Sequence, residues 1–307
     1  MHSGFQALHP LPAFLYYVGV LTFSMLFNQP LFLLPLLVVM LLLWFCVGQG
    51  KPKGKLLVFY FLMAIVVAVI NPIFSRRGAT ILFYFLDQPV TMESIIYGLL
   101  MGLTLFTVLI AFQSYNLVIT PDKLTYLFGS VAPRATLVFI MTLRFLPLLY
   151  RRWQQVVHVQ HTQGILFGQG SLRTKWRQGM QLLSILVTWS LEEAIQTALS
   201  MRARGYGLGK RSSYQRYRLR RREWFLLVYL GVTGGISLWG NFAGHGVLTV
   251  YPRLGSVGLS LLDWFYFLFF FGFITFPLWL EGREFFRWHV FKSKIYPLPI
   301  PQHPKKH

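Results

Sequence analysis

The sequence contains several apolar runs of about 20 residues, and a polar, basic segment over residues 121–222 interrupts them. A run of about 20 apolar residues matches the thickness of the hydrocarbon core of a bilayer. Only 12% of the residues are charged and 55% are hydrophobic, whereas soluble domains are about 25% charged. We therefore expect an all-α, polytopic membrane protein with a helical segment that stands outside the bilayer.

Six apolar runs are expected to cross the membrane, at about residues 11–27, 31–48, 56–74, 95–119, 224–239 and 261–280. The first run follows no basic leader, so we expect a retained span and not a cleaved signal peptide. The apolar run 81–86 is too short to cross and predicts a short strand or a re-entrant piece. The expected division is residues 1–119 (four spans), 120–222 (cytoplasmic arm), 223–281 (two spans) and 282–307 (cytoplasmic tail).

The distribution of basic residues predicts the orientation of the spans. Lys and Arg number 29 against 9 Asp and Glu, and 17 of the 29 lie within residues 121–222. The predicted outer loops hold only Arg76, Arg77 and Arg253. Because cytoplasmic loops of membrane proteins are enriched in Lys and Arg, both termini and the arm are expected in the cytoplasm. Anionic membrane lipids explain the net charge of +20, so we expect no nucleic-acid partner.

The polar segment is predicted to form three helices. The first is short and amphipathic and begins with Thr120-Pro121-Asp122, a typical helix start. The second runs from about residue 135 to 163 and contains Pro147, and the third runs from about 180 to 204 after a basic connection at 171–177. Each of the two longer helices ends at a glycine, Gly164 or Gly205, the residue that favours the left-handed helix cap. These ends are either exposed docking points for a partner or ordinary caps.

Motifs for catalysis or metal binding are weak, so we expect no enzyme, cofactor or catalytic residue. His158 and His161 have a spacing that a metal site can use, but no Cys or carboxylate nearby completes the set. An intramembrane prenyl or lipid transferase is one alternative, but it needs acidic metal-binding clusters, and residues 121–222 hold three acids. A self-sufficient secondary permease is another, but the predicted spans are nearly free of charge.

Several segments resemble the transmembrane (T) component of energy-coupling factor transporters, the cobalt-permease Q-like family. They are RFLPLL at residues 144–149, VQHTQG at 159–164 and ALSMRARGYG at 198–207, with NPIF at 71–74 and Gly78 upstream. The resemblance covers about residues 71–222, and the Ala-Arg-Gly at 203–205 is its most specific part. It implies a protein of the prokaryotic cell membrane.

In such transporters the T component is a scaffold whose cytoplasmic helices dock on two ATPases of the ATP-binding cassette (ABC) type. A separate small membrane subunit, the S subunit, binds a vitamin or a metal ion. The resemblance assigns one docking motif to Ala203, Arg204 and Gly205, and the other to Thr162, Gln163 and Gly164. Gln163 replaces the family's arginine and carries no charge, so we expect two different ATPases and not two copies of one. The substrate and the stoichiometry do not follow from the sequence.

Overall fold

The computed structural model describes residues 5, 8–48, 54–75, 78–85, 88–162, 171–209, 219–250, 255, 258 and 260–295. In these residues the chain forms nine helices and one antiparallel pair of strands, which confirms the all-α class. The chain divides into two compact units. The membrane unit comprises Met1–Lys123 and Tyr217–His307, and the arm unit comprises Leu124–Arg216.

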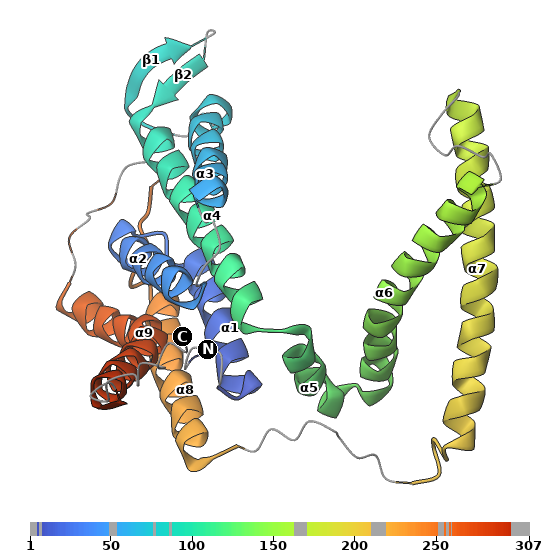
Figure 1. Cartoon of the computed structure of the whole chain (residues 1–307). Helices are drawn as coiled ribbons and strands as arrows, with labels where there is room; N and C mark the ends of the chain where they lie inside the picture. The colour runs from blue at the N-terminus through green and yellow to red at the C-terminus, as the bar shows by residue number, and fades with distance from the viewer. Residues whose placement is uncertain are drawn as a thin grey trace, which may run out of the picture. The chain divides into compact units, whose positions relative to one another are not determined.

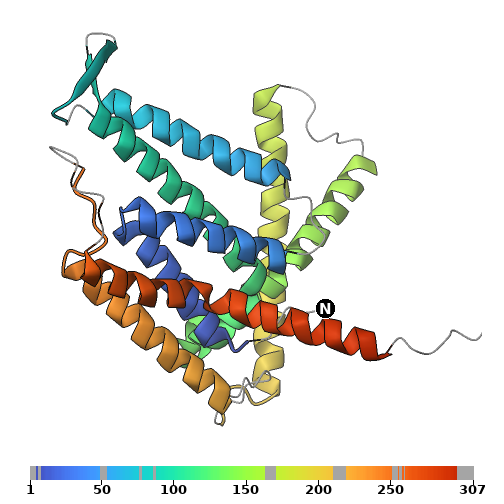
Figure 2. The same ribbon diagram turned by 90° about the vertical axis from the view of Figure 1, so that its left-hand side faces the viewer.

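The membrane unit is built around α4 (Met92–Val118), which packs against three earlier helices. These are α1 (Pro10–Leu26), α2 (Pro30–Val47) and α3 (Gly54–Phe74). Two later helices, α8 (Arg221–Phe242) and α9 (Leu261–Ile295), pack against each other, and α9 also contacts α2. Figures 1 and 2 show α3 beside α4 and α8 beside α9, so helix pairs close in sequence form the two sides of the unit.

Six described helices are long and apolar enough to cross a membrane, the number expected, but their identities differ in one case. The expected first span, α1, has 17 residues, or about 26 Å at 1.5 Å per residue, against a hydrocarbon core of about 30 Å. The sixth long helix is instead α6 (Pro133–Thr162) of the arm unit, whose apolar window has a mean hydropathy of 1.2.

Helices α3 and α4 approach closely because α4 carries glycine at residues 98 and 102. A Cβ atom at Gly98 would lie 2.6 Å from the carbonyl oxygen of Ala68, and one at Gly102 would lie 2.7 Å from that of Ala64. Glycines four residues apart form one flat face of a helix and let a neighbouring backbone approach. The small residues on both helices therefore fix the α3–α4 contact, and the rest of α3 remains largely exposed.

The core between α1, α2 and α9 consists mainly of aromatic rings. The ring centroids of Phe27 and Phe32 are 4.7 Å apart in a stacked arrangement, and Phe270 lies 5.1 Å from Phe27. All three side chains are at most 1% exposed. The buried hydroxyl of Tyr16 donates to the carbonyl oxygen of Ile274 at 3.0 Å, so its polar atom is satisfied inside this core.

The short apolar run before α4 forms a strand, which decides between the two expected alternatives. Strand β1 (Ile81–Phe85) pairs antiparallel with β2 (Gln88–Thr91), and β2 leads directly into α4. The backbone N–H of Thr80 donates to both carboxylate oxygens of Glu93, at 3.2 and 3.3 Å. Since Glu93 lies in the first turn of α4, this contact ties the start of the hairpin to the helix.

The arm unit contains α6, α7 (Leu172–Ala203) and most of α5 (Pro121–Val131). Helix α5 starts at Pro121 and α6 contains Pro147, both as expected. The basic stretch at 171–177 was expected to be a connection, but it is the first part of α7, because the Ser171 hydroxyl caps the helix by accepting from the Thr174 N–H. Figure 1 shows α6 and α7 running in opposite directions.

Candidate functional site

The C-terminal end of α7 is closed by a Schellman motif. Gly205 has φ +78°, the left-handed conformation that glycine adopts without strain. Its N–H donates to the Arg202 carbonyl oxygen, and the Tyr206 N–H donates to that of Met201, both at 3.0 Å. These two bonds define the Schellman cap. The cap predicted at Gly205 is therefore present, and it fixes the last turn that carries Ala203 and Arg204.

The side chain of Arg204 is exposed at this end. Ala203 is exposed as well, and Gly205 is half-buried. In the part of the chain that the structure describes, no carboxylate lies within ion-pair distance of Arg204. The acid Glu192 on the same helix instead accepts a hydrogen bond from the Gln196 side-chain amide at 3.5 Å. The guanidinium thus presents its donors to solvent, where a carboxylate from another chain could bind them.

The end of α6 carries the other predicted site residues, of which the structure describes one. Thr162 is the last residue of α6, and its hydroxyl donates to the Val159 carbonyl oxygen at 2.7 Å. Gln163 and Gly164 lie outside the described residues. Because α6 and α7 run in opposite directions, Thr162 and Arg204 lie at opposite ends of the helix pair (Figure 1). The two predicted docking points are therefore not one cluster but two separated ends.

The helices of the arm contact each other through Trp189, a residue that the sequence analysis did not single out. The rings of Phe145 on α6 and Trp189 on α7 are stacked, with centroids 5.7 Å apart and an angle of 15° between their planes. The guanidinium carbon of Arg152 lies 5.2 Å from the centroid of the Trp189 ring. Leu182, Leu186 and Trp189 recur at i, i+4 and i+7, a spacing that could have predicted this face.

A second face of α7 is apolar and uncovered within the arm. Leu191, Ile195 and Leu199 follow a spacing of i, i+4 and i+8, which places them on one helical face, and they are 61%, 61% and 60% exposed. Burying such side chains is favourable by about 1.5–3 kcal/mol each, so the face has the composition of a surface that another molecule or lipid covers.

Groups able to do chemistry are sparse in the described residues. His158 and His161 are exposed on α6, and no group of three or more His, Cys, Asp or Glu side chains is placed to hold a metal ion in this part of the chain. Cys46 is exposed on α2.

The six long apolar helices define a multi-pass membrane protein. The sequence model of the family CbiQ, cobalt transport protein, matches residues 6–215, which is more than half of the chain. The chain therefore belongs to this family of cobalt transport proteins.

Curated relatives carry the name energy-coupling factor transporter transmembrane protein EcfT. The protein from Lacticaseibacillus paracasei is 25% identical over 73% of this chain and 88% of its own length. The protein from Staphylococcus aureus is 25% identical over 66% of this chain and 76% of its own length. The protein from Listeria innocua is 26% identical over 58% of this chain and 71% of its own length. The similarity thus extends over most of each relative.

Proposed function

We propose that this chain is the transmembrane energy-coupling component of an ATP-driven uptake transporter of the energy-coupling factor type. It links two ABC-type ATPases to a separate small S subunit that binds the vitamin or metal ion. The names of the relatives and the family match support this role over a lipid transferase or a self-sufficient permease. The observation that carries the proposal is the exposed, Schellman-capped end of α7 with Arg204 next to the cap.

In this proposal Ala203, Arg204 and Gly205 dock on one ATPase. A guanidinium binds a carboxylate through two parallel N–H donors, and such charge-assisted contacts are stronger than neutral ones. Gly205 keeps the chain turning away just after Arg204, so the side chain stands at the tip. The chain itself does not catalyse ATP hydrolysis, and energy reaches it through this contact.

Thr162, Gln163 and Gly164 dock on the other ATPase. A glutamine amide can donate and accept hydrogen bonds but offers no charge and no planar five-donor group. The contact at Gln163 therefore selects a different protein surface from the contact at Arg204. This difference supports two distinct ATPase chains in each complex.

The proposal is tested with Arg204→Glu in the complete transporter. Placing an anion where the partner is expected to offer a carboxylate should abolish co-purification of one ATPase and abolish uptake, while the amount of protein in the membrane is unchanged. Arg151→Glu is the control, because Arg151 is also an exposed arginine of the arm but lies away from both predicted docking ends. Uptake at the wild-type level in Arg204→Glu, or an equal loss of uptake in Arg151→Glu, would contradict the role of the α7 end.

The proposed asymmetry has its own test. Mass analysis of the complex purified through this chain should find two different ATPase chains in equal amounts. Gln163→Arg should then increase the recovery of the ATPase that otherwise docks at Arg204. A complex that contains two copies of a single ATPase would rule out the asymmetry but not the coupling role.

We also propose that residues 120–222 form the cytoplasmic arm between spans at 1–119 and 223–281, with both termini and the tail 282–307 inside and membrane lipids around the spans. Because α6 is long and apolar, this placement needs a direct test. Single cysteines that replace Lys55, Thr80 or Ser171, in a Cys46→Ser background, should react with an impermeant thiol reagent outside the cell only at residue 80. Labelling of residue 171 from outside would mean that α6 crosses the membrane.

A further inference from the structure

The three side chains Phe145, Arg152 and Trp189 form a contact that we call the aromatic clamp. Trp189 stacks on Phe145 and lies under the Arg152 guanidinium. Phe145 and Arg152 are seven residues apart, so they lie on the same face of α6 two turns apart. Arg152 is itself held, because its Nη1 donates to the Gln155 side-chain oxygen at 3.2 Å. One indole ring of α7 thus contacts two turns of α6.

The clamp lies where α7 leaves α6. On its N-terminal side Leu182 and Leu186 share a face with Trp189, and both are 8% exposed. On its C-terminal side every side chain of residues 191–200 is exposed except that of Glu193. Residues 190–203 therefore extend from α6 as a rod of about 21 Å at 1.5 Å per residue, with Arg204 at its tip.

A rod transmits a displacement only if its base is fixed. A helix is stiff along its axis, but α7 would tilt at its base if the contact with α6 were loose. A wide ring that contacts two turns of α6 resists both sliding and rotation, whereas an aliphatic contact resists them less because it has no preferred plane. The clamp lies at the base of this rod, where a load on the tip would turn α7 relative to α6.

We propose that Trp189 is a positioning residue that fixes the crossing of α6 and α7, so that movement of the Arg204 tip is passed to α6. Trp189 contacts neither ATPase nor substrate in this proposal. It keeps the two docking ends at a fixed separation, and this determines how much of each ATPase movement reaches the membrane. The inference rests on the proposed coupling function.

The functional test compares Trp189→Ala, Trp189→Phe and the control Trp176→Ala in the complete transporter in liposomes. Trp176 is the matched control because it lies on the same helix and is 75% exposed. Trp189→Ala should still bind the ATPases and hydrolyse ATP, but uptake per ATP should fall about tenfold, a typical size for lost coupling. Trp189→Phe should retain at least half of the wild-type uptake per ATP. An unchanged uptake-to-ATP ratio in Trp189→Ala, or an equal loss in Trp176→Ala, would overturn the proposal.

A cross-link tests the same geometry if Trp189→Ala fails to assemble. Phe145→Cys with Trp189→Cys, in a Cys46→Ser background, should be joined by a short cleavable thiol reagent, whereas Phe145→Cys with Leu199→Cys should not. Uptake per ATP should be low before cross-linking, should rise when the pair is joined and should fall when the link is cleaved. If the cross-link does not form, or if uptake per ATP does not change when it forms, the proposed role of the clamp is wrong. If no ATPase binds the wild-type chain while the link still forms, the proposed function fails and the crossing geometry stands.

Discussion

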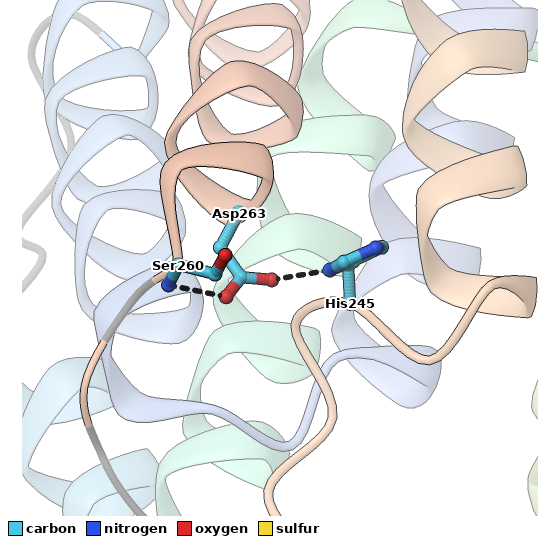
Figure 3. A network of polar contacts seen from close by, with 3 residues as sticks. All are labelled: His245, Ser260 and Asp263. Atoms are coloured by element: carbon cyan, nitrogen blue, oxygen red, sulfur yellow. Dashed lines mark hydrogen bonds and ion pairs between the residues drawn. The ribbon is translucent and has the colours of Figure 1, made fainter.

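His245 Nδ1 lies 2.7 Å from Asp263 Oδ1, across the connection between α8 and α9 (Figure 3). The other oxygen of Asp263 accepts from the Ser260 N–H at 2.7 Å, and Asp263 is the third residue of α9. An acid at this position caps the start of a helix. His245 is part of the Schellman cap of α8, because its N–H donates to the Gly240 carbonyl oxygen at 2.9 Å. One carboxylate therefore joins the end of α8 to the start of α9.

The first prediction concerns this pair. Asp263→Ala and His245→Ala should each lower the thermal unfolding midpoint of the purified protein, because each leaves a partly buried polar partner without its hydrogen bond. The loss of unfolding free energy in the double variant should be smaller than the sum of the losses in the two single variants, by a coupling energy of about 1 kcal/mol. His161→Ala, on an exposed position of α6, is the control and should have no effect. Strictly additive losses would show that the two residues do not stabilise each other.

The second prediction concerns the left-handed cap of α7. Gly205→Ala forces a residue with a Cβ atom into φ +78°, at a cost of about 1–2 kcal/mol. The last turn should fray, and recovery of the ATPase that docks there should fall. Gly209→Ala is the control, since a Cβ at Gly209 meets nothing within 4 Å and its φ lies outside the left-handed region. Recovery of the ATPase with Gly205→Asn should lie between the values for Gly205→Ala and Gly209→Ala, because asparagine tolerates the left-handed conformation better than alanine does.

The third prediction concerns the packing of α3 on α4. Gly102→Leu places a side chain where even a Cβ would lie 2.7 Å from the Ala64 carbonyl oxygen, so α3 must move away. The yield of folded protein and the thermal midpoint should both fall. Gly231→Leu on α8 should be tolerated, since a Cβ there meets nothing within 4 Å. Equal behaviour of the two variants would show that the close contact between α3 and α4 is not required.

The fourth prediction is a pH dependence at the end of α4. Lys123 Nζ donates to the Val118 carbonyl oxygen at 2.9 Å, and burial lowers the pKa of the Lys123 ammonium. Between this lowered pKa and the unfolded value of about 10.4, the unfolded chain binds the extra proton, so the stability of the fold should rise with pH in that window. Lys123→Arg keeps a donor but does not titrate in this range. The thermal midpoint of the wild-type protein should therefore rise relative to that of Lys123→Arg as the pH rises toward 10. A constant difference would contradict the assignment.

Local signals in the sequence predicted most of the helices and part of the candidate site. Pro121 and Gly205 determine backbone conformation by themselves, so the start of α5 at Pro121 and the left-handed cap of α7 at Gly205 could be predicted. The length and apolarity of the spans reflect the bilayer, which acts on each segment separately.

Contacts between helices were not predicted, because they depend on pairs of distant residues. Nothing local marks Phe145 and Trp189, which are 44 positions apart, as stacking partners. The approach of Gly98 to Ala68 depends on the register of α3 against α4. The start of α7 at 172 was missed for a different reason: the basic residues at 173–177 were interpreted as a connection, although Ser171 is a good helix cap.

The aromatic core also constrains the order in which the chain can mature during synthesis. Helices α3 and α4 follow each other directly in sequence and can pair as soon as α4 leaves the ribosome. Phe27 and Phe32, by contrast, are packed by Phe270, which is made more than 200 residues later. Until α9 arrives, the rings of α1 and α2 must face lipid or an insertion chaperone, so nascent chains truncated before α9 should be the form that quality-control proteases recognise.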